Sequence, residues 1–164
     1  MILFSSALEL RIKKNKTMND LIIDATTNKI FLTIIKDTKN IYTSKFENSK
    51  NNFDKFLILI DDLLNKNKLT IKDLNRIYVN RGPGSFAGIR SSISIVKGYH
   101  ISQNIDYYCF SFLDFINLKS SIKNQIFKNS TLLSQYHNIK YEKIPELCNK
   151  YKIKKNLIKP LYLS

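Results

Sequence analysis

Cysteine, histidine, tryptophan and glycine are all scarce in this chain of 164 residues. Its two cysteines, Cys109 and Cys148, exclude a disulfide-stapled scaffold and a four-cysteine zinc ribbon. Its two histidines, His100 and His137, lack the close spacing of a local metal-ligand motif. No apolar run approaches the roughly 20 residues that a membrane-spanning helix needs. The composition, 43% hydrophobic and 12% aromatic, is instead that of a globular protein with one core or two small lobes.

Acidic residues are also few, 13 against 27 basic ones, which gives a net charge of +14. The excess is greatest near the C-terminus, where residues 117–164 hold ten lysines and two glutamates, a net +8. Lysine outnumbers arginine by 23 to four, and this usage, together with abundant asparagine and isoleucine, is typical of an AT-rich genome. The basic end is therefore either a contact surface for polyanions or a solvated face.

The order of residues predicts three regions along the chain. Residues 1–17 have basic side chains after, not before, a short apolar stretch, which is the wrong order for a secretory signal. We therefore expect residues 1–17 to be an extension outside the fold, residues 18–116 to form the main lobe and residues 117–164 to form a reduced, basic C-terminal region. Without an export signal, and with unpaired cysteines, the expected compartment is the cytoplasm.

Hydrophobic periodicity predicts an α/β fold. Apolar, β-branched runs indicate strands over residues 21–25, 30–35, 41–46, 76–80 and 106–110. Spacing of three and four predicts helices over 51–65 and 85–102, another starting in 111–118 and one over 144–150, with a capped turn at 70–73. Because short turns join the first three strands, we expect an antiparallel hairpin at one side of a mixed sheet with flanking helices.

All four glycines fall between Gly82 and Gly98, three of them in a corner that follows the fourth strand. Gly82, Pro83 and Gly84 predict a sharp turn, and Ser85 is a suitable N-cap for the next helix. The spacing fits neither a dinucleotide-binding loop nor a P-loop. From spacing alone, the corner is either a tight strand-to-helix connection or an anion site at a helix N-terminus.

The helix after this corner carries two stripes. Phe86, Ile89, Ile93 and Val96 form an apolar stripe that we expect to face the sheet. The second stripe consists of small residues: Gly88, Ser91, Ser94 and Gly98. Since glycine costs about 1 kcal/mol in a helix interior, this stripe predicts close approach of another helix, in a partner or in the same domain.

The segment Arg81–Arg90, RGPGSFAGIR, closely resembles the GPGSFTG-[LV]-R signature of the TsaB (YeaZ) family. Residues 21–27 are similar to that family's opening strand, and residues 159–164 to its closing motif. The resemblance implies one lobe of the ASKHA fold (actin-like ATPase, ribonuclease H-like). Nothing after Ile116 matches the family's second lobe, which we therefore expect to be missing or reduced to helices.

The resemblance further implies a non-catalytic scaffold that pairs with the catalytic subunit TsaD, and with the ATPase TsaE, to install threonylcarbamoyladenosine in tRNA. ATP and metal are then expected on the partner subunits, with no cofactor here. Asp24, Thr26 and Thr27 would be a relic phosphate loop, since no glycine there permits close approach to a phosphate. The signature residues implied are Gly82, Pro83, Gly84, Ser85, Phe86 and Arg90, and the small stripe would be the partner interface. Without its partner the chain would be either a homodimer or a monomer, and the basic end would contact tRNA.

Two alternatives belong to other functional classes. The first is a glycoprotease-like or nucleotide-hydrolysing enzyme that uses Asp24 and the Gly82–Gly84 corner. The second is a stand-alone RNA-binding domain, although the sequence lacks the platform of aromatic and arginine residues that such domains use.

Overall fold

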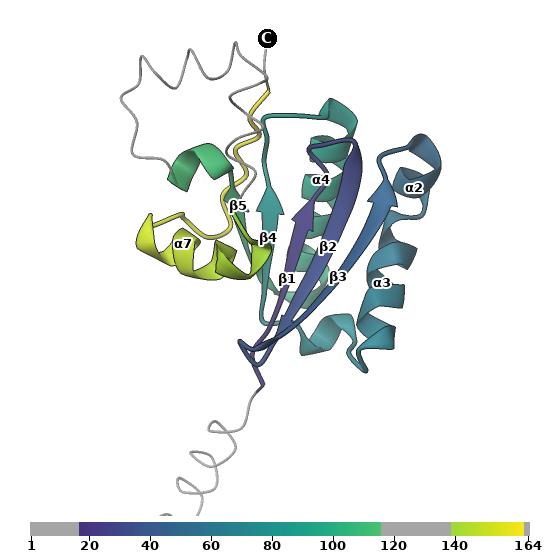
Figure 1. The fold of residues 1–164 in the computed structure, drawn as a ribbon, viewed down its shortest axis with the longest axis vertical. Helices are drawn as coiled ribbons and strands as arrows, with labels where there is room; N and C mark the ends of the chain where they lie inside the picture. Colours follow the sequence, from purple (N-terminus) through teal and green to yellow (C-terminus); the bar gives the residue numbers. More distant parts are fainter. Residues whose placement is uncertain (1–16, 116–138, 163–164) are drawn as a thin grey trace, which may run out of the picture.

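The computed structural model describes residues 17–115 and 139–162, which include a five-stranded sheet in the order β3-β2-β1-β4-β5 (Figure 1). Strands β1 (Asn19–Asp24), β2 (Lys29–Lys36) and β3 (Asn40–Glu47) are antiparallel neighbours. Strands β4 (Arg76–Asn80) and β5 (Asp106–Phe110) extend the sheet in parallel with β1. The predicted mixed sheet with an antiparallel hairpin at its edge is confirmed.

Helices α3 (Phe56–Lys66) and α4 (Phe86–Gln103) cover one face of the sheet (Figure 1). The predicted helix over 51–65 is two helices, because the chain leaves helical geometry at Lys55 (φ −102°, ψ 9°), which separates α2 (Lys50–Asp54) from α3. This bend lets Phe53 and Phe56 pack edge to face on the same core, with ring centroids 6.3 Å apart. The predicted turn at 70–73 is a 3₁₀ turn, Ile71–Asp73, in which the Asp73 carboxylate accepts from the Thr70 N–H.

The opposite face of the sheet is covered by residues that lie far apart in the sequence. Here a 3₁₀ turn at Phe112–Phe115 meets a second one at Tyr141–Lys143 and the helix α7 (Ile144–Lys150). Ile144 and Cys148 are buried there against Ile22 and Tyr78 of the sheet. Burial of an aliphatic side chain such as that of Ile144 contributes about 1.5–3 kcal/mol to the free energy of folding. The described part of the basic C-terminal region thus shares a core with the main lobe.

The chain then follows the outer edge of β5, where Asn156 N–H donates to the Tyr107 carbonyl over 2.8 Å and Lys155 forms a bridge with Tyr108. This pairing covers a strand edge that would otherwise expose unpaired backbone groups. Residues 1–16 of the expected extension, all of residues 117–138, and the continuation beyond 115 of the helix predicted to start in 111–118 lie outside the described residues. No helix in the described part of the chain is long and apolar enough to cross a membrane.

Candidate functional site

The glycine-rich corner joins β4 to α4 and brings three chain segments together. Gly82 has φ +109°, and a Cβ there would overlap the carbonyl oxygen of Leu161 in the C-terminal tail. Gly84 has φ +155°, and a Cβ there would overlap the carbonyl oxygen of Thr26 in the β1–β2 loop. Between them, Pro83 follows a cis peptide bond. Both glycines are therefore explained by backbone conformation and by close approach, without a ligand.

Ser85 is the predicted N-cap of α4, and the structure confirms it. Its hydroxyl accepts a hydrogen bond from the Gly88 N–H over 3.1 Å, and its own N–H donates to the Thr26 carbonyl over 2.7 Å. One turn into the helix, Gly88 is buried where a Cβ would overlap the Ala25 carbonyl oxygen. The start of α4 is thus packed on the end of β1, and the backbone N–H of Gly88 already donates to the Ser85 hydroxyl.

Two expectations about α4 are wrong. Phe86 does not face the sheet: it is 56% exposed, and its ring lies 4.9 Å from that of Tyr162 and 5.2 Å from the Arg90 guanidinium. The buried face consists of Gly88, Ile89, Ser92, Ile93 and Val96, and Phe86 projects about 90° away from its centre at 3.6 residues per turn. Gly88, conversely, packs inside the domain and does not belong to a partner-facing stripe.

The rest of the small stripe lies at the surface of α4. Ser94 and Gly98 are exposed, Ser91 is half-buried, and a Cβ at Gly98 would meet no atom within 4 Å. Ser91 and Ser94 line a shallow concavity of about 430 Å³ together with Phe86, Ala87 and Arg90. This surface is open to a partner, and it joins the second half of the stripe to the signature residues Phe86 and Arg90.

Asp24 ends β1 and is fully buried. Its Oδ1 accepts hydrogen bonds from the Thr26 N–H (3.0 Å) and hydroxyl (2.7 Å), so the carboxylate holds the turn at the end of the strand. Thr27 contributes to the same turn, where its hydroxyl accepts from the Lys29 N–H over 3.2 Å. The β1–β2 loop is thus held together by its own side chains.

Asp24 has a further partner that sequence reasoning missed. The Tyr141 hydroxyl donates to Asp24 Oδ2 over 2.8 Å, from the turn that precedes α7. The Tyr141 ring lies 5.5 Å from Phe31 and 6.4 Å from Phe112. Burial, the charge of Asp24 and this hydrogen bond raise the pKa of Tyr141, so the hydroxyl stays a donor. No local signal indicates a contact between residues 117 positions apart.

Arg81, the first residue of the signature segment, fixes the C-terminal tail across the corner. Its Nη2 lies 2.6 Å from Asp114 Oδ1, and its Nη1 donates to the Lys159 carbonyl over 3.2 Å. The Leu161 N–H in turn donates to the Arg81 carbonyl over 2.8 Å. The Gly82–Gly84 turn, the β1–β2 loop and the C-terminal segment therefore form one connected unit.

The available chemistry at this unit is limited. Both carboxylate oxygens of Asp24 are engaged within the chain, and the glycines of the corner contact backbone carbonyls. Within residues 17–115 and 139–162, no group of three or more histidine, cysteine, aspartate and glutamate side chains comes together as a metal site would require. Among the described residues, the Asp24 carboxylate and the backbone of the corner are thus occupied by contacts within the chain.

The chain is similar to proteins of one known family. The family model "TsaD: tRNA N6-adenosine threonylcarbamoyltransferase" matches residues 46–138. The "tRNA threonylcarbamoyladenosine biosynthesis protein TsaB" of Buchnera aphidicola subsp. Schizaphis graminum is 33% identical over 104 residues, 63% of this chain and 50% of that protein. The protein of the same name from subsp. Baizongia pistaciae is 30% identical over 59 residues, 35% of this chain and 27% of that one.

Among solved structures, YeaZ from Pseudomonas aeruginosa superposes with a TM-score of 0.55 at 18% identity, covering 70% of this chain and 50% of that one. That likeness shows a shared α/β fold, and together with the family model it supports the predicted ASKHA-type lobe. The chain spans half the length, or less, of the curated relatives that it matches. With its signature corner, its sheet and these relatives, the chain belongs to the TsaB (YeaZ) family, within the wider group of proteins with a TsaD-like domain.

Proposed function

We propose that this chain is a non-catalytic accessory subunit in the biosynthesis of threonylcarbamoyladenosine in tRNA. The observation that carries the proposal is the state of Asp24, which is buried with both carboxylate oxygens bonded inside the chain. A carboxylate that is fully buried and hydrogen-bonded inside the chain is closed to a metal-bound nucleotide. The names of the relatives supply the process, and work on tRNA would place the protein in the cytoplasm.

The catalytic partner in this proposal is a TsaD-like subunit, with a TsaE-like ATPase as a further component that holds nucleotide and metal. The surface that supports pairing is the exposed side of α3 and α4. On α3, Leu57 and Ile58 are 51% and 58% exposed, and on α4 the small residues Ser94 and Gly98 leave room for a neighbouring helix.

Both helices pack on the same core of the sheet, α3 through Phe56 and Ile60 and α4 through Ile89 and Ile93. Together they offer a two-helix surface on which a second pair of helices can pack. The same surface would support a homodimer when the TsaD-like subunit is absent.

The first test is co-expression of this chain with the TsaD-like protein of the same genome, followed by size-exclusion chromatography. We expect a stable complex and modification of a tRNA transcript by the assembled system. Lack of any complex would refute the accessory role.

The second test addresses catalysis through Asp24→Ala, with Asp24→Asn as the variant that keeps the side-chain shape. In a complex that still assembles, we expect modification activity within a few-fold of the wild type. A loss of many-fold, or magnesium-dependent ATP hydrolysis by the isolated wild-type chain, would favour the alternative of a glycoprotease-like or nucleotide-hydrolysing enzyme.

A further inference from the structure

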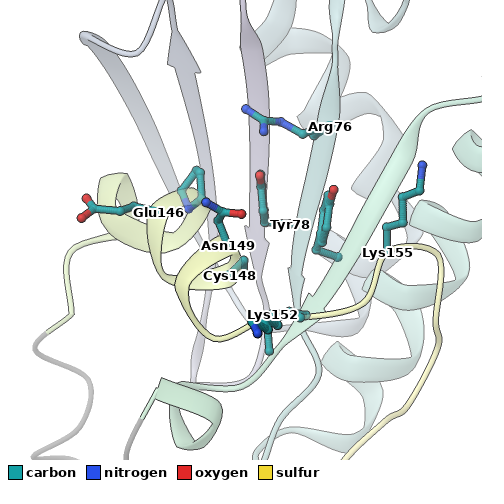
Figure 2. Close-up of a pocket in the computed structure, with 10 residues that line it drawn as sticks. Arg76, Tyr78, Glu146, Cys148, Asn149, Lys152 and Lys155 are labelled. Carbon is teal, nitrogen blue, oxygen red and sulfur yellow. The ribbon is translucent and has the colours of Figure 1, made fainter.

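A pocket of about 590 Å³ lies on the sheet face opposite α3 and α4, between α7 and strands β4 and β5 (Figure 2). Tyr78 of β4 and Tyr108 of β5 line it as a stacked pair, with centroids 5.1 Å apart and planes 16° apart. Arg76 stands at one end of this pair, and Lys152 and Lys155 come from the segment that follows α7 (Figure 2). Its volume is within the usual range for a pocket that holds a small organic ligand.

Several hydrogen-bond donors in this pocket have no partner among the residues that the structure describes. Tyr78 is only 2% exposed, and neither its hydroxyl nor that of Tyr108 makes a hydrogen bond with the described residues, so both can donate to a ligand in the pocket. Arg76 uses Nε and Nη2 on the Asp20 carboxylate, at 3.0 and 2.8 Å, which leaves Nη1 available. Burial raises the pKa of Tyr78, so its hydroxyl stays protonated and able to donate.

The charged groups around the pocket favour an anion. Arg76, Lys152 and Lys155 line it against one carboxylate, Glu146, and the exposed Glu146 also pairs with Lys143 at 3.4 Å. Lys155 is paired with Asp106 at 3.1 Å, but both side chains are exposed, and such a pair is held by little free energy. Lys152 is exposed and unpaired within the described part of the chain.

We propose that this pocket binds one nucleotide of an unpaired RNA segment, with the phosphate toward Lys152 and the base against Tyr108. The half-buried Tyr108 is the more open of the two rings, and stacking of a base on an aromatic side chain is the common mode of binding single-stranded nucleic acid. The hydroxyls and Arg76 would donate to phosphate or base oxygens. An acidic peptide would satisfy the lysines but would leave the ring surface unused. The inference rests on the proposed function insofar as tRNA supplies the RNA.

The experiment measures binding of the full chain to an unmodified tRNA transcript and to a short uridine oligonucleotide across a salt series. The test variant is Lys152→Glu, and the matched control is Lys154→Glu, which makes the same charge change two residues away at an exposed lysine that does not line the pocket. Tyr108→Phe, which keeps the ring, is the second variant. Thermal melting of each variant checks that it is folded.

We expect Lys152→Glu to weaken RNA binding about tenfold and to lower the slope of log K against log salt by about one, while Lys154→Glu changes affinity less than twofold. Tyr108→Phe should weaken binding a few-fold, since only the hydroxyl is lost. Equal effects of the two lysine variants would overturn the inference in favour of a diffuse electrostatic field. Tight binding of a poly-aspartate peptide without RNA binding would overturn it in favour of an acidic partner.

The outcome is independent of the pairing test. Complex formation with the TsaD-like subunit alongside RNA binding insensitive to Lys152→Glu would refute this pocket and leave the proposed function standing. RNA binding that responds to Lys152→Glu, in a chain that forms no complex with the TsaD-like subunit, would support the pocket and refute the accessory role.

Discussion

The hydrogen bond between Tyr141 and Asp24 ties the C-terminal segment to the first strand, and Tyr141→Phe removes it with the least other change. The variant keeps the ring, so the contacts with Phe31 at 5.5 Å and Phe112 at 6.4 Å stay in place. What is lost is one donor to a fully buried carboxylate, 2.8 Å from Oδ2. A hydrogen bond to a charged group contributes about 1.5–3 kcal/mol, and an oxygen left without its donor loses that much.

We therefore expect Tyr141→Phe to lower the free energy of unfolding by about 1.5–3 kcal/mol, measured by urea denaturation with an unchanged m-value. At about 3 °C per kcal/mol for a chain of this size, Tm should fall by roughly 5–9 °C. The control is Tyr162→Phe, because Tyr162 is 41% exposed and its hydroxyl makes no hydrogen bond with the described residues; we expect a change below about 0.5 kcal/mol.

A double-mutant cycle of Tyr141→Phe with Asp24→Ala separates this bond from the rest of the loop. The coupling free energy should be at least about 1 kcal/mol, since the two side chains contact each other directly. A coupling free energy near zero, or a Tyr141→Phe variant as stable as the Tyr162→Phe control, would refute the contact. It would also refute the argument that both oxygens of Asp24 are hydrogen-bonded within the chain.

Three further predictions concern α4 and the thiols. Ser94→Leu should leave the isolated chain as stable as the wild type, because Ser94 is exposed. It should weaken binding to a TsaD-like partner, measured by calorimetry, by roughly 5- to 150-fold, the equivalent of about 1–3 kcal/mol of overpacking. A large fall in Tm of the free variant would show that Ser94 packs inside the chain instead. Gly88→Ala should destabilise the chain by at least about 1 kcal/mol through overlap with a backbone carbonyl, whereas Gly98→Ala, in open space, should stabilise it by about 0.5–1 kcal/mol; equal effects in urea denaturation would contradict this. Burial raises the pKa of Cys109 to about 11 and that of Cys148 to about 12, so neither should react with a thiol reagent at pH 8 until the chain unfolds; fast labelling of the native protein would show one of them accessible.

Much of the fold followed from local pattern. The predicted strands over 30–35 and 76–80 agree within one residue at each end with β2 and β4, because short β-branched runs between turns leave few alternatives. The N-cap at Ser85 and the carboxylate of Asp24 in its turn were also predictable, since each acts on backbone only two or three residues away. The break at Lys55 was not, because it depends on how Phe53 and Phe56 share the core.

The candidate site shows where sequence reasoning stops. Spacing placed Gly88 and Gly98 on one stripe, yet one packs against the Ala25 carbonyl and the other faces open space. Helical periodicity gives an angle around the axis, but it does not say how close the sheet comes at each turn. The same limit misplaced Phe86, which lies at the edge of the buried arc and packs on Tyr162 instead.

The sequence by itself determined the α/β order of elements, the sharp corner at Gly82–Gly84 and the family to which that corner belongs, because each depends on residues that are close together in the chain. The tertiary structure alone decided that residues 139–153 return to cover the second face of the sheet, that Tyr141 bonds to Asp24, and that Arg76, Tyr108 and Lys152 line one pocket. These contacts join side chains tens of residues apart, and they exist only because folding buries apolar surface such as that of Ile144 and thereby fixes the polar groups beside it.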